Sequence, residues 1–154
     1  MLVFLIGFMG AGKTTLGNSL AKQLDWHFID LDKEIEHRSA STIPDLFALG
    51  GETWFRKTEQ QVLYDIVKQF RGDLDNAQNC IIACGGGTPC FEENMTFMKE
   101  NGFVIYLEVS PEILYERLLR TPASKRPLLT CTLPYIHNLL DQRRPFYEAA
   151  HWKC

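Results

Sequence analysis

A glycine-rich segment near the N-terminus constrains this chain more than any other feature. Residues Gly7–Thr14, with the sequence GFMGAGKT, match the pattern G-x-x-x-x-G-K-[ST] at every fixed position. The segment follows the apolar run Leu2–Ile6 and leads into Lys13–Leu24, whose leucines repeat at helical spacing. In such a strand–loop–helix unit, the loop N–H groups and the helix N-terminus face a phosphate. The context therefore favours a nucleotide-phosphate loop over a glycine-rich turn that merely precedes a lysine.

The same pattern predicts a role for each residue type in the loop. The Lys13 ammonium would reach the β- and γ-phosphates, and the Thr14 hydroxyl would bind Mg²⁺. The predicted nucleotide-binding residues of the loop and of the start of the helix are Gly10, Ala11, Gly12, Lys13, Thr14 and Thr15.

Four short apolar runs do not alternate with polar residues, which is typical of strands buried on both faces of a parallel sheet. These runs are Leu2–Ile6, Trp26–Ile29, Cys80–Cys84 and Phe103–Val109. Helical patterns separate and follow them, over Lys13–Leu24, Thr53–Phe70, Pro111–Leu119 and Thr132–Tyr147. The alternation predicts an α/β fold, a three-layer doubly wound parallel sheet whose ligands bind at the carboxyl ends of the strands.

Length and charge narrow the functional classes. The 154 residues fit a single domain, 1–154, and 16 Lys and Arg against 19 Asp and Glu give a net charge of −3. A slightly acidic chain is a poor candidate for binding nucleic acid, because such binding needs a basic face. No apolar run approaches the length of a membrane-spanning helix, about 20 residues. Five cysteines without a C-x-x-C pattern predict reduced thiols in a cytoplasmic protein.

Two acidic residues, Asp30 and Asp32, end the second predicted strand. At alternate positions of a strand they would project from one side, next to the phosphate loop. We expect Asp30 to face the Mg²⁺ shell and Asp32 to face a substrate hydroxyl. The alternative is helix capping, with Asp32 starting a helix over Lys33–Arg38, although capping accounts for one aspartate and not for two.

Three further segments carry groups that suit an anionic ligand. Arg56 lies near the start of a long helix, where its guanidinium could bind a planar carboxylate or remain a solvated charge. Gly85–Gly87 follows the third strand, so the backbone could approach a ligand closely or form only a flexible turn. Arg143 could likewise bind a ligand or interact with the C-terminus of its own helix.

Residues 120–131 are polar, basic and bounded by prolines, as a mobile lid over a triphosphate would be. An arginine that closes with such a lid could stabilise charge in the transition state.

Other signatures limit the type of nucleotide-binding protein. The chain has no Asn-Lys-x-Asp segment to recognise a guanine base and no ATP-binding-cassette signature, and it is short for a motor or a ring-forming ATPase. A kinase for a small molecule is the leading interpretation.

An ordered set of motifs resembles the shikimate kinase family, which belongs to the nucleoside-monophosphate-kinase-like group of P-loop proteins. The set runs from Leu2 to about Tyr147 and comprises Gly7–Thr14, Asp30-x-Asp32, Gly50-Gly51-Glu52 with Phe55-Arg56, Gly85–Gly87, Arg126-Pro127-Leu128 and Arg143-x-Pro145-x-Tyr147. The resemblance implies ATP-dependent phosphorylation of the 3-hydroxyl of shikimate, on the route to chorismate and the aromatic amino acids. It also implies the strand order 2-3-1-4 of a P-loop kinase and a substrate-binding helical insertion over residues 31–72.

The resemblance further implies roles for individual residues. Asp32 would hold shikimate hydroxyls and could accept the proton, while Asp30 and Thr14 would organise Mg²⁺ around ATP. The residues implied to contact the shikimate carboxylate are Arg56 and Arg143 through their side chains and Gly86 and Gly87 through their backbone. Arg126 would move in with the lid, and Arg120 would lie near the adenine and the phosphates. Phe47, Phe55, Pro127 and Leu128 would wall the pocket.

The chain departs from the family after Tyr147, where members usually continue with a fifth strand, an adenine-contacting loop and a last helix. Here the sequence ends at Cys154, so we expect the fifth strand to be missing or vestigial. The expected protein is a monomer that binds ATP and shikimate and neither nucleic acid nor membranes. The alternatives are a kinase for another small molecule, such as gluconate or a nucleotide, and a nucleotide-binding module weakened by the short C-terminal part.

Overall fold

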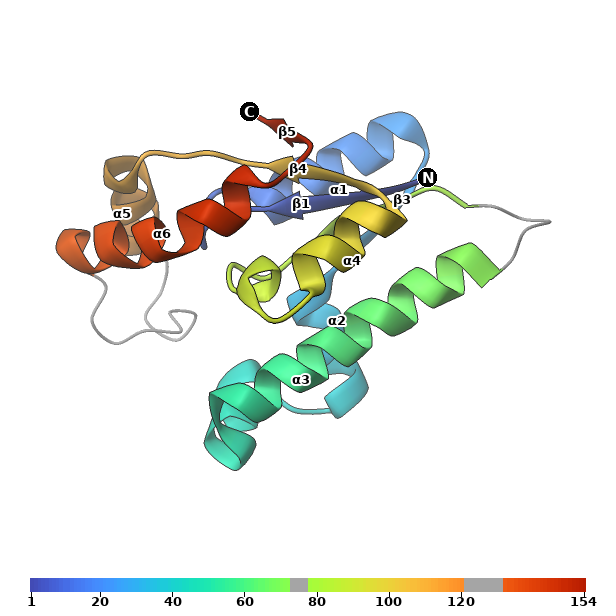
Figure 1. Cartoon of the computed structure of the whole chain (residues 1–154), viewed down its shortest axis with the longest axis horizontal. Helices are drawn as coiled ribbons and strands as arrows, with labels where there is room; N and C mark the ends of the chain where they lie inside the picture. Colours follow the sequence, from blue (N-terminus) through green and yellow to red (C-terminus); the bar gives the residue numbers. More distant parts are fainter. Residues whose placement is uncertain (73–77, 121–131) are drawn as a thin grey trace.

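The protein is represented by a computed structural model that describes residues 1–72, 78–120 and 132–154. Its centre is a five-stranded sheet with the order β2-β3-β1-β4-β5, and every neighbouring pair is parallel (Figure 1). The strands are β1 (Leu2–Ile6), β2 (His27–Asp30), β3 (Cys80–Ala83), β4 (Phe103–Tyr106) and β5 (Trp152–Lys153). The predicted α/β class and the order 2-3-1-4 of the first four strands are therefore confirmed.

The fifth strand, expected to be missing or vestigial, is present and two residues long. It pairs with β4 at Ile105↔Trp152 and Tyr106↔Lys153. Backbone hydrogen bonds continue the ladder on both sides, because the N–H of His151 donates to the carbonyl oxygen of Val104 at 3.0 Å and that of Cys154 donates to Tyr106 at 3.0 Å. A strand this short has no detectable apolar periodicity, so only its pairing defines it.

Six α-helices and one short 3₁₀ helix are assigned in the described residues. They are α1 (Lys13–Leu24), α2 (Leu31–Ser39), α3 (Ile43–Gly72), η1 (Thr88–Cys90), α4 (Asn94–Asn101), α5 (Pro111–Arg120) and α6 (Leu133–Glu148). No helix within 1–72, 78–120 or 132–154 is long and apolar enough to cross a membrane. Figure 1 shows α2 beside the N-terminal part of α3, away from β4 and β5.

The helix predicted from Thr53 onwards is the second part of α3, which begins ten residues earlier at Ile43. The two parts meet at Gly51, whose φ of 74° and ψ of 179° are not helical. Glycine adopts a positive φ at little cost, so at this residue the chain can change direction and continue at once as a second helix. The change of direction sets the angle at which Thr53 and the residues after it approach the sheet.

Strand pairing brings the site together. Ala83, the last residue of β3, is the partner of Leu5 in β1 on one side and of Asp30 in β2 on the other. The segments that follow these strands therefore start side by side at one edge of the sheet. That edge holds the phosphate loop, the acidic pair and the three-glycine turn.

Candidate active site

The phosphate loop is held in a conformation that glycine favours. Gly7, Gly10 and Gly12 have φ values of 141°, 81° and 99°, which other residues rarely adopt. The loop borders a cavity of about 820 Å³. The residues lining that cavity are Met9, Gly10, Ala11, Gly12, Lys13, Thr14, Thr15, Leu16, Ser19, Asp30, Asp32, Ala83, Cys84, Gly85, Gly86 and Arg117. All six residues predicted for the loop and the helix start are among them.

The Lys13 side chain is folded back into the loop. Its Nζ donates hydrogen bonds to the carbonyl oxygens of Gly7 at 2.8 Å and Phe8 at 2.9 Å. Burial of the ammonium lowers the pKa of Lys13 to about 8, against the opposing influence of the Asp32 carboxylate and other anions nearby. Lys13 is therefore a weakly hydrated cation at the wall of the cavity, which is where a phosphate would need charge compensation.

Thr14 and Asp30 form a close oxygen pair at the same cavity. The Thr14 hydroxyl donates to Asp30 Oδ2 at 2.6 Å, and the other carboxylate oxygen accepts the N–H of Lys33 at 3.3 Å. Hydroxyl and carboxylate oxygens are ligands that suit Mg²⁺. No group of three or more His, Cys, Asp or Glu suited to a metal occurs in the described part of the chain. Two oxygen ligands beside a phosphate loop fit an ion that also binds nucleotide phosphates and water.

The expectation that Asp30 and Asp32 occupy alternate positions of one strand is wrong. Asp30 ends β2 and is the N-cap of α2, so Asp32 lies in the first turn of that helix. Capping occurs, but at Asp30 and not at Asp32, because the Asp30 side chain satisfies a free N–H of the first helical turn. Both carboxylates still line the large cavity.

Asp32 is a crowded carboxylate. Burial, followed by the nearby carboxylates of Glu59 and Asp30, raises the pKa of Asp32 to about 6. A Cβ placed on Gly85 would lie 2.9 Å from Asp32 Oδ1 and 2.7 Å from Glu59 Oε1, so both side chains lie against the same glycine. An acid with a raised proton affinity beside a phosphate site is suited to accept a proton from a hydroxyl.

A second cavity, of about 440 Å³, adjoins the first at the three-glycine turn. Its lining residues are Glu52, Thr53, Arg56, Gly87, Cys90, Phe91, Leu139, Gln142 and Arg143. Of the turn, Gly85 and Gly86 line the large cavity, whereas Gly87 lines this one. The predicted substrate residues therefore lie along two adjoining cavities, with Asp32 in one and both arginines in the other.

The two arginines of the second cavity differ in their partners. Arg56 Nη1 donates to Glu59 Oε2 at 2.7 Å, and its Nε lies 3.8 Å from Glu52 Oε1. Arg143 Nη1 is buried and has no hydrogen-bond partner within residues 1–72, 78–120 and 132–154. An unsatisfied buried guanidinium N–H is costly, so its presence indicates the place of an anionic ligand.

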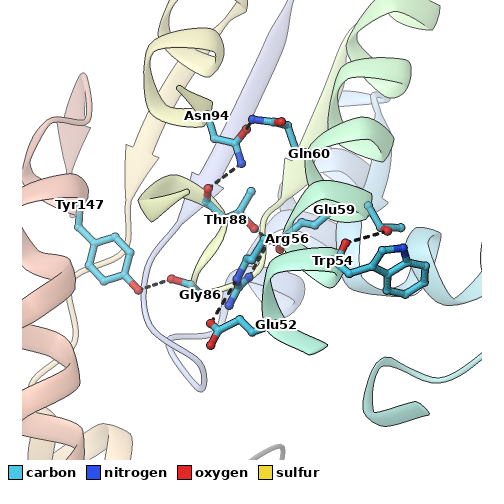
Figure 2. Close-up of polar contacts among 10 residues, drawn as sticks. Glu52, Trp54, Arg56, Glu59, Gln60, Gly86, Thr88, Asn94 and Tyr147 are labelled. Atoms are coloured by element: carbon cyan, nitrogen blue, oxygen red, sulfur yellow. Dashed lines mark hydrogen bonds and ion pairs between the residues drawn. The ribbon is translucent and has the colours of Figure 1, made fainter. Parts of the chain in front are cut away.

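A chain of polar contacts runs from Arg56 through Glu59 to residues of η1 and α4 (Figure 2). Glu59, which is fully buried, also accepts a hydrogen bond from the Thr88 hydroxyl at 2.6 Å. Asn94 Nδ2 donates to the carbonyl oxygen of Thr88 at 2.9 Å, and Gln60 Nε2 donates to Asn94 Oδ1 at 3.0 Å. Side chains of α3 and α4 thus hold η1, which directly follows the three-glycine turn.

Arg117 is a cavity residue that the sequence interpretation missed. Its Nη1 donates to the carbonyl oxygens of Gly10 and Ala11, both at 3.1 Å. Arg120, which was predicted for the nucleotide instead, ends α5, is exposed and lines neither cavity. Helical spacing could have indicated this residue. Arg117 lies close to the face of α5 that carries the buried Leu114 and Leu118, so its side chain can reach the structure beneath the helix.

Several other predicted residues lie apart from the cavities or outside the described residues. Phe47 and Phe55 stack with ring centroids 4.5 Å apart and line neither cavity, and Phe55 belongs to the core. Arg126, Pro127, Leu128 and most of the predicted lid at 120–131 fall outside the residues that the structure describes.

Comparison with known proteins gives a consistent result. The family model described as shikimate kinase matches residues 9–154. A shikimate kinase of Alkaliphilus oremlandii is 42% identical over 149 residues, which span 95% of this chain and 83% of that protein. The crystal structure of shikimate kinase from Bacteroides thetaiotaomicron has a TM-score of 0.88 and 39% identity, covering 99% of this chain and 85% of that one. Shikimate kinase from Acinetobacter baumannii, in complex with shikimate, has a TM-score of 0.87 and 36% identity, covering 99% and 82%.

Proposed function

The chain belongs to the shikimate kinase family, and we propose that its adjoining cavities bind ATP and shikimate so that the γ-phosphoryl group passes to the 3-hydroxyl of shikimate. The observation that carries the assignment of the residues is the unpartnered Arg143 Nη1, buried beside a glycine turn that separates a phosphate-loop cavity from a smaller one. An anionic group belongs in the smaller cavity, and ATP belongs in the larger.

The nucleotide half rests on the phosphate loop. The N–H groups of Gly10–Thr15 would receive the phosphates, and Lys13 would leave its carbonyl partners to contact the β- and γ-phosphates. Arg117 would fix the shape of the loop through Gly10 and Ala11. Thr14 and Asp30 would hold Mg²⁺, which would offset the negative charge of the phosphates.

The substrate half rests on the three-glycine turn and the residues around it. Arg56 and Arg143 would bind the shikimate carboxylate in the smaller cavity, with the backbone of Gly86 and Gly87 beside it. Asp32, across the turn, would accept hydrogen bonds from the shikimate hydroxyls and take the proton of the attacking one. Phosphoryl transfer then needs positioning and charge compensation rather than a covalent intermediate.

The assay that tests this function measures ADP formation with each substrate varied separately. We expect turnover to require both ATP and shikimate, and the methyl ester of shikimate to be a poor substrate because it lacks the anionic group. ATP hydrolysis that does not respond to millimolar shikimate would contradict the proposal. Arg143→Ala should raise KM for shikimate about 100-fold and leave KM for ATP within a factor of about 2, because a charge-assisted contact to the carboxylate is lost.

Gly87→Ala gives an independent prediction for the same cavity. A Cβ on Gly87 would lie 2.5 Å from Arg56 Cζ, so the guanidinium must move. We expect KM for shikimate to rise about tenfold, with KM for ATP unchanged, which separate substrate titrations would measure. Gly72→Ala is the matched control, because a Cβ there meets no atom of the described residues within 4 Å. Equal kinetics for the two variants would show that the position of Arg56 does not matter for binding.

We extend the proposal to the organisation of the chain. Residues 31–72 would form a substrate-binding insertion in the single domain, since Asp32, Arg56 and Glu59 all come from α2 and α3. A monomer as the working unit is part of the same proposal. Light scattering after gel filtration tests this state, and localisation in the cytoplasm remains part of the proposal.

A further inference from the structure

Tyr147 belongs to the Arg143-x-Pro145-x-Tyr147 motif, yet the roles proposed so far do not include it. Its side chain is fully buried, and its ring stacks on Tyr106 of β4 with centroids 5.0 Å apart. Its hydroxyl donates a hydrogen bond of 2.6 Å to the carbonyl oxygen of Gly86 (Figure 2). The last helix is thereby joined to the turn that separates the two cavities.

Arg143 and Tyr147 contact the same glycine from one side of α6. They are four residues apart, so their side chains lie one helical turn apart on one face. Arg143 Nη1 is 3.3 Å from the position that a Cβ on Gly86 would occupy, while the Tyr147 hydroxyl binds the carbonyl oxygen of that residue. The distance from Arg143 Nη1 to the turn therefore depends on how this helix is attached to Gly86.

The hydrogen bond also sets the direction of the next N–H group. The chain has no cis peptide bond among its described residues, so the Gly87 N–H points away from the Gly86 carbonyl and from Tyr147. Within the turn, the N–H group of Thr88 donates to the carbonyl oxygen of Gly85 at 3.2 Å, and that of Cys90 donates to the carbonyl oxygen of Gly87 at 3.0 Å. Among the described residues, no backbone hydrogen bond of the turn uses the Gly87 N–H, so this group is available to a ligand.

The Tyr147 ring and hydroxyl are well suited to this attachment. Stacking on Tyr106 fixes the ring plane, so the hydroxyl has little freedom to leave Gly86. Burial raises the pKa of Tyr147 above its ordinary value, so the phenol remains a donor throughout the physiological range. A phenylalanine would preserve the packing and remove the hydroxyl, which bonds Gly86 and also interacts with the Arg143 side chain.

We propose that Tyr147 is a positioning residue for the substrate carboxylate: through Gly86 it orients the Gly86–Gly87 peptide and holds it beside Arg143, so that the Gly87 N–H and the guanidinium bind one anionic group. This inference rests on the proposed function, which places the shikimate carboxylate at Arg143. It assigns Tyr147 no contact with the substrate.

The test is Tyr147→Phe in the full chain. We expect KM for shikimate to rise about tenfold and KM for ATP to stay within a factor of about 2, because a single hydrogen bond at the carboxylate side is lost. The preference for shikimate over its methyl ester should shrink by a similar factor. Combined with Arg143→Lys, the substitution should raise KM by less than the product of the single effects, because both changes disturb one contact.

Tyr106→Phe is the matched control, since it removes a hydroxyl from the same stacked pair and leaves the bond to Gly86 in place. A shikimate KM that is unchanged in Tyr147→Phe, or raised equally in Tyr106→Phe, overturns the inference. If KM for shikimate is unchanged in both Arg143→Ala and Tyr147→Phe, the proposed function itself fails. If it is unchanged in Tyr147→Phe but raised in Arg143→Ala, only the positioning role of Tyr147 fails. Melting curves of all variants define an assay temperature at which each variant is folded, so that unfolding does not account for a change in KM.

Discussion

Lys13→Met should lower kcat about 1,000-fold while the protein remains folded. The ammonium is the cation of the phosphate loop, and removal of one preorganised charge at a transferring phosphoryl group costs about 100- to 1,000-fold in rate. Its Nζ is held by the carbonyl oxygens of Gly7 and Phe8, which keep it at the cavity wall. Methionine has a similar length and no charge, so it removes the compensation for phosphate and retains most of the packing.

Stability and catalysis should separate in this variant. Methionine leaves two carbonyl oxygens without their donor, but it also avoids the cost of a buried ammonium, which lowers the pKa of Lys13 to about 8. These effects oppose each other, so we expect a melting temperature within a few degrees of the parent protein. Lys22→Met is the control, because Lys22 is an exposed lysine in the last turn of the same helix. A kcat for Lys13→Met equal to that of Lys22→Met would remove Lys13 from the chemistry.

The parts of the fold that the sequence could predict are those that local patterns specify. Leu2–Ile6, the phosphate loop and Lys13–Leu24 follow each other without a gap, and the structure gives the same bounds for β1 and α1. The first part of α3 escaped detection because the Gly50-Gly51 pair interrupts the helical pattern, and this part of the helix also packs against α2, which lies elsewhere in the sequence. Likewise β5 exists because β4 offers an edge with which to pair.

The candidate site divides in a similar way. Residues inside recognisable motifs were located from the sequence, whereas Arg117, Glu59 and Thr88 gain their places from neighbours distant in the chain. Glu59 is 29 residues from Thr88, and its burial follows from helix α3 facing η1. A charged residue on a helix is usually solvated, so nothing in the local sequence distinguishes Glu59 from Glu52, which is exposed. The site therefore depends on tertiary packing beyond its motifs.

Asp32→Asn is expected to lower kcat about 100-fold or more, since general acid–base assistance by a placed side chain contributes at least that much. Asparagine has nearly the same shape and cannot take a proton from a hydroxyl. Asp32 adjoins Glu59 and Asp30, so neutralising it relieves repulsion between buried carboxylates. The variant should thus be at least as stable as the parent protein, and a loss of turnover cannot come from unfolding.

ATP binding provides the second measurement that makes this prediction specific. Asp32 lines the phosphate cavity, so removing its negative charge should leave the Kd for ATP unchanged or lower it. Asp65→Asn, which changes an exposed carboxylate on α3, should alter neither quantity. If Asp32→Asn weakened ATP binding as much as it lowered kcat, Asp32 would belong to the nucleotide site, and the proton would have to leave the hydroxyl by another route. Retained ATP affinity with lost turnover would instead place Asp32 between the two cavities as the acceptor for the attacking hydroxyl.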